Sequence, residues 1–336
     1  MLRYLTRRIV HSVAVLVGVL VFVFFVVNMV GDPARLMLPP QAPHELYLDT
    51  RRELGLDDPI LVQFWRSFSG WATGDFGDSI WQGVPALPLA LSRLPATLLL
   101  TVVSLGFAIP LALALGSFSA LRPGSALDRL LTTISLAGVS IADFWLGLML
   151  ILLVGVHLGW LPTSGFGGPA YIVLPALTLA MRPIGRIAQV ARSALVEEMD
   201  KPYIITLRAK GMSEGAIVRQ HALKNCAIPT ITVCGDELVT FLNGAVVIET
   251  IFAWPGIGNL FIAAIERRDL PLILACVAVV SCLAILVNLL VDLSYSWLDP
   301  RATVVQSRTA KRKRGAGTLQ GKGTPSPHTE TLDQPG

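Results

Sequence analysis

The sequence from residue 95 to residue 120 reads PATLLLTVVSLGFAIPLALALGSFSA. It holds no Asp, Glu, Lys or Arg. It is also longer than the roughly 20 apolar residues that a helix needs to cross a bilayer core about 30 Å thick. The stretch therefore predicts a transmembrane helix.

Five further apolar stretches complete a predicted set of six membrane spans. The set covers residues 9–30, 95–120, 130–156, 171–190, 228–251 and 270–296. Of the 336 residues, 53% are hydrophobic and only 15% are charged, with a mean hydropathy of +0.63, whereas a soluble domain carries about 25% charged residues. The predicted fold is an all-α polytopic membrane protein with about six transmembrane helices.

Three arginines, Arg3, Arg7 and Arg8, precede the first apolar stretch, as they do in a secretory signal peptide. That stretch is too long for the hydrophobic region of a signal peptide, and no small-residue cleavage site follows it. We interpret it as an uncleaved first span.

The distribution of Lys and Arg predicts the orientation of the chain. An even number of spans places both termini on the same side of the membrane. If that side is the cytoplasm, the cytoplasmic segments hold 20 of the 27 Lys and Arg residues. Cytoplasmic loops carry the positive excess, so we expect both termini in the cytoplasm and the chain in the inner or plasma membrane.

Composition divides the chain into three regions. Residues 1–94 combine the first span with an extracytoplasmic cap, whose segment 31–94 holds 8 acidic and 5 basic residues and many aromatic ones. We expect this cap to be helical and to place its Trp and Tyr residues at the membrane interface. Residues 95–301 form the predicted transmembrane domain. Residues 302–336 form a basic tail rich in Gly, Thr and Pro, which we expect to be disordered in the cytoplasm.

The predicted cytoplasmic loop 192–225 reads RSALVEEMDKPYIITLRAKGMSEGAIVRQHALKN. It is too polar for the bilayer, yet its composition favours helices. Residues 203–210 favour one short helix, Gly211 suits the turn that ends it, and Ser213 suits the start of a second. We expect the pair to form a compact projection that fits a groove on a partner protein. An ordinary basic loop held at anionic lipids is the alternative.

The core of this loop resembles that of the inner-membrane permeases of ABC importers, specifically the first permease of the dipeptide, oligopeptide and nickel group. The matching residues are Arg208, Ala209, Lys210, Gly211, Met212, Ser213 and Glu214, followed by His221, Ala222, Leu223, Lys224, Asn225 and Pro229. The general superfamily pattern, Glu-Ala-Ala with a later Gly and Ile-x-Leu-Pro, is matched only at Gly211 and Leu223. Further similar stretches are residues 31–34, 54–57, 74–77, 158–162, 249–258 and 299–301.

This resemblance implies the architecture and partners of a type I ABC importer permease. The loop residues Arg208, Ala209, Lys210, Gly211, Ser213, Glu214, His221 and Asn225 would couple the spans to a separate ABC ATPase. A second, homologous permease would complete a heterodimeric pore, and an extracytoplasmic solute-binding protein would deliver peptides. The other expected contact is with the lipid bilayer; no nucleic acid partner and no cofactor are expected.

Acidic residues inside predicted spans are costly and suggest function. Asp143 falls near the middle of the third span, and Asp236 and Glu237 fall in the fifth with Asn243. These four residues are candidates for a hydrated translocation path that meets a peptide's ammonium group. The acids could equally pair with Arg182, with Arg186 or with the second permease.

A second candidate site lies between the fifth and sixth spans. The sequence 249–258 reads ETIFAWPGIG. The resemblance places Glu249, Trp254, Pro255, Gly256 and Gly258 at a periplasmic gate, while an interfacial turn anchored by Trp254 is the plainer interpretation. Neither a dinucleotide fingerprint nor a phosphate-binding loop is present.

The remaining chemistry-bearing residues predict no catalytic or metal site. The four cysteines match no metal-ligand spacing and are interpreted as reduced, buried, small apolar residues, and the five histidines are scattered. Two other classes of function remain open: a secondary transporter that uses ions without an ATPase, and an intramembrane enzyme. The cargo is also open among dipeptides, oligopeptides, glutathione and nickel chelates.

Overall fold

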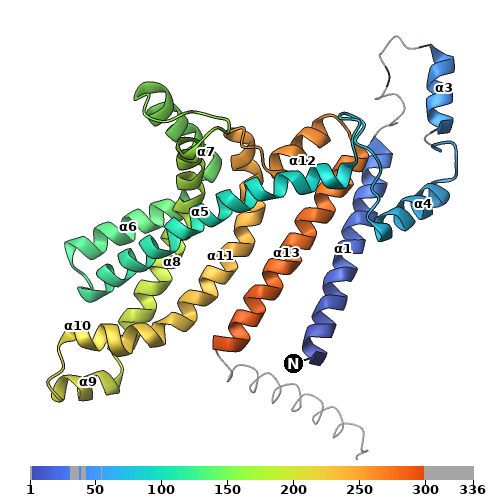
Figure 1. Cartoon of the computed structure of the whole chain (residues 1–336). Helices are drawn as coiled ribbons and strands as arrows, with labels where there is room; N and C mark the ends of the chain where they lie inside the picture. The colour runs from blue at the N-terminus through green and yellow to red at the C-terminus, as the bar shows by residue number, and fades with distance from the viewer. Residues whose placement is uncertain (1, 31–37, 39–42, 54, 299–336) are drawn as a thin grey trace, which may run out of the picture. The chain divides into compact units, whose positions relative to one another are not determined.

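The protein is a bundle of helices, shown in the computed structural model in Figure 1. The structure describes residues 2–30, 38, 43–53 and 55–298. Within these residues every named element is a helix, and the sole β-type pairing is an isolated bridge between Asp78 and Pro85. The predicted all-α class is therefore confirmed.

The described part of the N-terminal region holds three helices, α1 (Leu2–Val30), α3 (His44–Glu53) and α4 (Ile60–Thr73). The buried side chains Leu20 and Phe24 of α1 pack against α13 (Leu270–Leu298) and against aromatic residues of α4. Gly74 ends α4 with φ of 82°, a conformation that favours glycine. Within the described residues, the segment between the first two predicted spans contains the expected helices, α3 and α4.

The centre of the bundle is α8 (Pro169–Met199), which packs against α5 (Ala86–Leu121), α6 (Ala126–Ser140) and α11 (Leu223–Ile251). Small residues let these helices approach closely. A Cβ added to Gly116 of α5 would lie 2.6 Å from the Ala188 carbonyl oxygen, and one added to Gly138 of α6 would lie 2.9 Å from that of Met181. Such small-residue contacts are the usual packing device of transmembrane helices.

The prediction of one continuous helix over the third span, 130–156, was wrong. Helix α6 ends at Ser140, and the chain turns by 103° before α7 (Asp143–Leu150) and the π-helix η1 (Ile151–His157). Ile141 and Ala142 are extended, and the amide N–H of Ile141 still bonds to Ala137. Asp143 consequently lies at the first turn of a new helix rather than in the middle of a straight one.

Among the residues that the structure describes, length and composition mark three helices as able to cross a membrane, and the number rises to five if two bent helix pairs each count as one span. The second bent pair is α11, which turns by 52°. A shorter apolar segment, Val10–Val26, belongs to α1, the first predicted span. Two other spans differ in length from the prediction, because α5 already begins at Ala86 and α8 continues to Met199.

The four cysteines are free, and two of them, Cys226 and Cys276, are buried as expected. Cys234 is half-buried. Cys282 of α13 is exposed, so its predicted burial was wrong.

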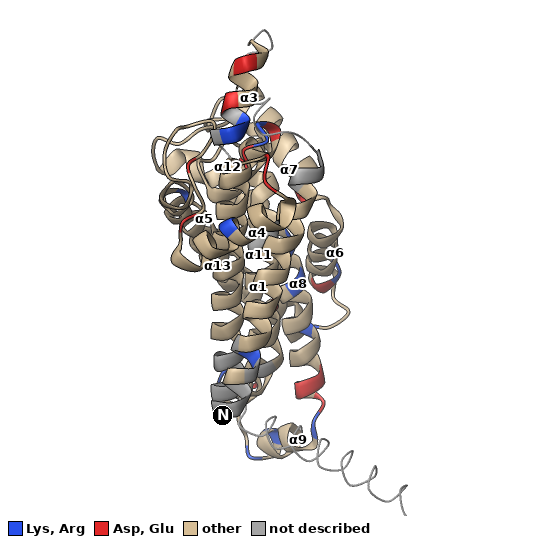
Figure 2. Cartoon of the chain, turned by 90° about the vertical axis from the view of Figure 1, so that its right-hand side faces the viewer, with Lys and Arg blue, Asp and Glu red and all other residues tan. Residues whose placement is uncertain are grey.

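Charge is concentrated on particular elements. Figure 2 shows coloured residues on α3 and around α9, while long parts of α1, α11 and α13 are uncharged. The chain divides into two units, residues 1–289 and 290–336, and the described part of the second is the end of α13. The predicted tail 302–336 and the similar stretches 31–34 and 299–301 lie outside the described residues.

Candidate functional site

The 192–225 loop turns sharply at Gly211, between α9 (Pro202–Ala209) and α10 (Glu214–Ile217). Gly211 has φ of 82°, and its N–H donates to the Arg208 carbonyl at 2.9 Å, while the Met212 N–H donates to Leu207 at 3.3 Å. This pair of bonds is the Schellman arrangement, which satisfies the last carbonyls of a helix. Both the helix-ending glycine and the second helix beginning after Ser213 are confirmed.

An exposed salt bridge between Arg208 and Glu214 joins the two sides of the turn. The Arg208 guanidinium donates to both carboxylate oxygens of Glu214, at 2.6 Å and 3.2 Å. This forked geometry holds the end of α9 against the start of α10. The hydrogen bonds from Arg208 lower the pKa of the Glu214 carboxyl, and the same hydrogen bonds raise the pKa of the Arg208 guanidinium.

The base of the loop is closed by Glu198, the buried last acidic residue of α8. Its carboxylate accepts hydrogen bonds from the Tyr203 hydroxyl and from the side-chain amide of Asn225, each at 2.7 Å, and from the Lys201 ammonium. These partners come from the linker after α8, from α9 and from α11. Burial is the main cause that raises the pKa of the Tyr203 hydroxyl, and the hydrogen bond to Glu198 raises it further. The hydrogen bond to Glu198 also raises the pKa of the Lys201 ammonium.

The loop has a buried side and an open side. Ile204 of α9 and Ile217 of α10 are fully buried, whereas Ile205 is 64% exposed. Ala209, Lys210, Gly211 and Ser213 are exposed along the turn, and His221 is half-buried on the following π-helix η2 (Val218–Ala222). The buried pair anchors a rigid turn, which leaves the Ile205 side and the turn itself available to a partner.

The loop continues into the bundle through a second buried carboxylate. Asp128 of α6, 3% exposed, accepts hydrogen bonds from Arg192 of α8 at 2.6 Å and 2.7 Å, from the Gly124 N–H at 2.8 Å and from the Ser119 hydroxyl. The start of the loop is thereby tied to the α5–α6 turn. A displacement of the loop therefore acts on α8, α6 and α5 together.

At the other end of α11, Glu249 forms a fully buried cluster with α5 and α12 (Ile257–Glu266). One carboxylate oxygen accepts from the Thr97 hydroxyl at 2.6 Å, and the other accepts from the N–H groups of Gly258 at 2.7 Å and Asn259 at 3.1 Å. The Ile257 N–H donates to Thr97 at 2.9 Å. The cluster satisfies the free N–H groups that begin α12 and places a carboxylate where the helix dipole favours it.

The Glu249 carboxylate leaves no space for a side chain at either glycine of the predicted gate, Gly256 or Gly258. A Cβ added to Gly256 would collide with the Glu249 carboxylate, and one added to Gly258 would lie 2.7 Å from the Cα of Val246. Next to them, the buried indole of Trp254 donates to the Ala96 carbonyl at 2.9 Å and meets Phe166 edge to face. Glu249, Trp254, Gly256 and Gly258, with Pro255 between them, are thus brought to one place.

Among the candidate translocation residues whose side chains the structure describes, Asp143, Asp236 and Glu237, no hydrogen bond joins one to another. Glu237 is 1% exposed and accepts a hydrogen bond from Arg186 at 2.8 Å, which agrees with pairing, one of the two alternatives. Asp236 is exposed, Asp143 is half-buried, and the side chain of Asn243 lies outside the described residues.

Sequence reasoning missed four residues that hold these sites together: Glu198, Tyr203, Asp128 and Thr97. The signal for Asp128 was available, because the sequence Ser125-Ala-Leu-Asp128 is a helix-capping pattern and the Ser125 hydroxyl does accept from the Asp128 N–H. Nothing in the sequence distinguishes Glu198 from the exposed Glu197 beside it.

Long apolar helices that could cross a membrane, with a polar loop between two of them, define the class of multi-pass membrane proteins. The chain belongs to the family of binding-protein-dependent transport system inner membrane components, which matches residues 112–304, and the N-terminal domain of such components matches residues 1–101. It is therefore a multi-pass permease subunit of an ABC importer, which works with a separate ATPase and a solute-binding protein, and not an enzyme.

Curated relatives cover nearly the whole chain. It is 36% identical over 316 residues to the oligopeptide transport system permease protein AppB of Bacillus subtilis, covering 90% of this chain and 99% of that protein. It is 38% identical over 301 residues to the glutathione transport system permease protein GsiC of Escherichia coli K12, covering 89% and 98%. A probable peptide ABC transporter permease of Sinorhizobium fredii is 37% identical over 307 residues, covering 89% and 98%.

Solved structures support the fold. Two inward-facing crystal forms of the MetNI methionine ABC transporter match with TM-scores of 0.51 and 0.53, at 22% and 21% identity, over 63% of this chain and 96% of theirs. The expected permease architecture is confirmed, and ion-coupled transport by this chain alone is not favoured.

Proposed function

We propose that this chain forms half of the translocation path of a peptide importer. The relatives described above are named for oligopeptides, peptides and glutathione, and glutathione is itself a small peptide. The single observation that carries the proposal is their similarity over about nine-tenths of the chain, because it includes both the 192–225 loop and the Glu249 cluster.

We place the 192–225 loop, and with it both termini, in the cytoplasm, where its exposed turn docks into a groove of the ATPase. The excess of Lys and Arg on that side supports this orientation. A docking element must pass on motion without deforming, and three features give the loop that rigidity: the Gly211 turn, the Arg208–Glu214 bridge and the Glu198 hub.

We propose a second, homologous permease as the other half of the pore. Asp236 is exposed on α11, within a predicted span, and a charged side chain facing hydrocarbon is strongly unfavourable. A water-filled path between two permeases removes that cost. The same cost applies to Asp143 to a smaller degree, because its side chain is half-buried.

We assign the extracytoplasmic gate to the Glu249 cluster and the solute-binding protein's contacts to the cap of residues 31–94. Thr97 of α5 and the start of α12 share one carboxylate of α11. Relative movement of α5 and α11 must either carry α12 along or break these bonds. The path then alternates between two states that ATP binding and hydrolysis populate in turn.

Uptake by the assembled complex in vesicles tests the proposal. We expect ATP inside the vesicles and binding protein outside to drive accumulation of a labelled tripeptide, with unlabelled peptides competing and free amino acids or nickel salts not competing. Competition by a nickel chelate instead would reassign the cargo. Accumulation driven by an ion gradient without ATP would overturn the importer itself.

A further inference from the structure

The six predicted spans contain only two Lys or Arg residues, Arg182 and Arg186, and both lie in the fourth span. They are four residues apart on α8 and therefore share one face of that helix. Arg186 is neutralised, because its guanidinium donates to the buried carboxylate of Glu237 at 2.8 Å. Arg182 lies close enough to Asp143 of α7 for their charges to interact, yet no salt bridge joins these two described side chains.

Arg182 is also the point at which the central helix is exposed. Every residue of α8 from Leu174 to Arg192 is described, and among them Arg182 alone is exposed. At 1.5 Å per residue, it lies about 20 Å from the start of α8 at Pro169 and about 15 Å from Arg192. Arg182 is therefore near the middle of a hydrocarbon core about 30 Å thick, too deep for its guanidinium to reach either membrane surface.

The depth of Arg182 indicates what its exposed side contacts. An arginine at mid-membrane is strongly unfavourable against hydrocarbon, and such residues almost always face the bundle interior or a water-filled cavity. The exposed Asp236 belongs to α11, which packs against α8, and it has the same need for water. The side of α8 that carries Arg182 thus belongs to the water-filled path of the proposed function.

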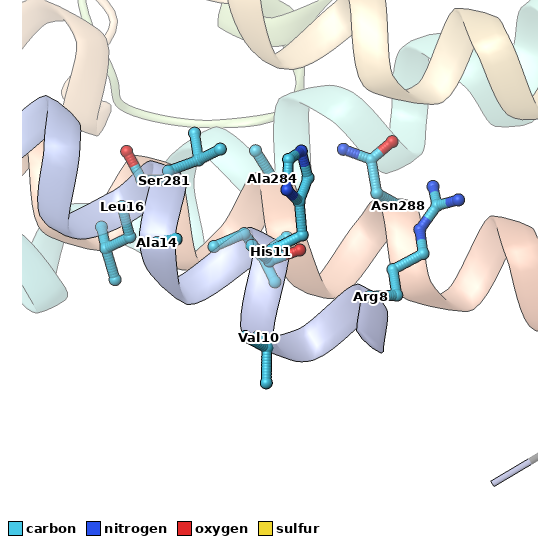
Figure 3. Close-up of a pocket in the computed structure, with 11 residues that line it drawn as sticks. Arg8, Val10, His11, Ala14, Leu16, Ser281, Ala284 and Asn288 are labelled. Atoms are coloured by element: carbon cyan, nitrogen blue, oxygen red, sulfur yellow. The ribbon is translucent and has the colours of Figure 1, made fainter. Parts of the chain in front are cut away.

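The large groove of the chain is separate from this path. It encloses about 930 Å³ between α1 and α13, and Figure 3 shows Arg8, His11 and Asn288 along it. Among the described residues its lining comes from these two helices, with none from α7, α8 or α11. The groove therefore offers no second cation beside Arg182.

We propose that Arg182 binds the C-terminal carboxylate of a peptide as the peptide crosses the membrane. This inference rests on the proposed peptide-importer function and adds a binding residue to it. A guanidinium can hold a carboxylate through two parallel hydrogen bonds. Within the predicted spans, Arg182 is the one basic residue that no acid of the described chain already holds. Asp143 and Asp236 remain the candidates for the ammonium group at the other end of the peptide.

Uptake of two matched peptides by the complete importer tests this assignment. The complex in vesicles receives ATP and binding protein saturated with a labelled tripeptide that ends in either a free carboxylate or an amide. We expect Arg182→Gln to slow uptake of the free acid about tenfold, as for the loss of a hydrogen bond between charged groups, and to leave uptake of the amide nearly unchanged. The ratio of the two rates is taken within one preparation, so it does not depend on the amount of folded complex.

Two further variants act as controls. Arg182→Lys keeps a cation and should retain most of the preference for the free acid. Arg122→Gln removes an exposed arginine outside the spans and should leave both rates unchanged.

Equal loss of both peptides in Arg182→Gln would overturn the proposal, because that is the result expected if Arg182 pairs with an acid of the second permease. Unchanged uptake of both peptides would overturn it as well. If the wild-type complex took up neither peptide, the peptide-importer function would itself be wrong, and this inference would fall with it.

Discussion

The Glu198 carboxylate and the Asn225 side-chain amide, 27 positions apart, form a hydrogen bond of 2.7 Å that closes the base of the 192–225 loop. The same carboxylate accepts the Tyr203 hydroxyl and the Lys201 ammonium. One buried acid thus fixes where the loop leaves α8 and where it enters α11. The loop is therefore a rigid extension of two long helices.

Removing this hub should loosen the loop. Glu198→Ala removes the acceptor of the Tyr203 hydroxyl and of the Asn225 side-chain amide, and an intramolecular hydrogen bond contributes about 0.5–1.5 kcal/mol to stability. We expect a lower midpoint of thermal unfolding for the purified complex and weaker stimulation of ATP hydrolysis by substrate. Glu197→Ala, at the exposed neighbouring position, is the control; equal effects of the two changes would show that Glu198 is no hub.

The Gly211 turn should depend on pH through Glu214. Arg208 holds the pKa of Glu214 below its ordinary value of 4.5. Because the carboxylate is the form favoured by folding, its contribution is complete above pH 4.5 and is lost as the pH falls through the lowered pKa. A spin label at Ser213 should therefore become more mobile in that acidic range. Glu214→Gln should be mobile at every pH, and a wild-type-like transition in this variant would disprove the assignment.

Alanine at Gly256 should disrupt the Glu249 cluster. The added Cβ collides with the carboxylate, which must then release Thr97 or the N–H groups that begin α12. We expect a strong loss of transport, together with faster amide exchange at the start of α12. Gly168→Ala has open space around its Cβ and extended φ of 164°, so it should transport normally. Normal exchange in Gly256→Ala would contradict the capping role.

The Asp128–Arg192 pair should matter more as a pair than as single charges. Arg192→Gln leaves a buried carboxylate without its cation, which typically costs about 3–5 kcal/mol. The double variant Asp128→Asn, Arg192→Gln removes both charges and should recover much of that loss in thermal unfolding. Arg129→Gln, at an exposed neighbour, should be neutral. Additive effects of the two single changes would exclude direct coupling between the two charges.

Much of the fold could be predicted from the sequence, because long apolar runs and turn glycines are local signals. The run 95–120 lies within α5, and Gly211 ends α9 as expected. The 103° turn after Ser140 could not be predicted: the residues at the break, Ile141 and Ala142, include neither glycine nor proline. Both α6 and α7 pack against α8, and such tertiary contacts are not encoded in a local pattern.

The candidate sites were predictable only in part for a similar reason. Glu249, Trp254, Gly256 and Gly258 are close in sequence and meet in space, but Thr97 joins them from 152 positions away. Glu198 and Glu197 are chemically identical, and only burial distinguishes them. Long-range partners and burial are set by the packing of α5, α8 and α11, which a local pattern does not specify.

The docking of the 192–225 loop on the ATPase is the central claim, and crosslinking tests it most directly. The four native cysteines are replaced by alanine, and a single cysteine is placed at Ser213 on the turn or, as a control, at the exposed Ala126 of α6. Each variant is then treated in membranes with a short bifunctional crosslinker.

We predict that Ser213→Cys captures the ATPase subunit. Gly211→Val, which forces a β-branched residue into a φ of 82°, should sharply reduce that capture, and Ala126→Cys should capture far less. Failure of Ser213→Cys to capture the ATPase, in a complex that still shows ATP-driven uptake, would contradict the assignment of this loop.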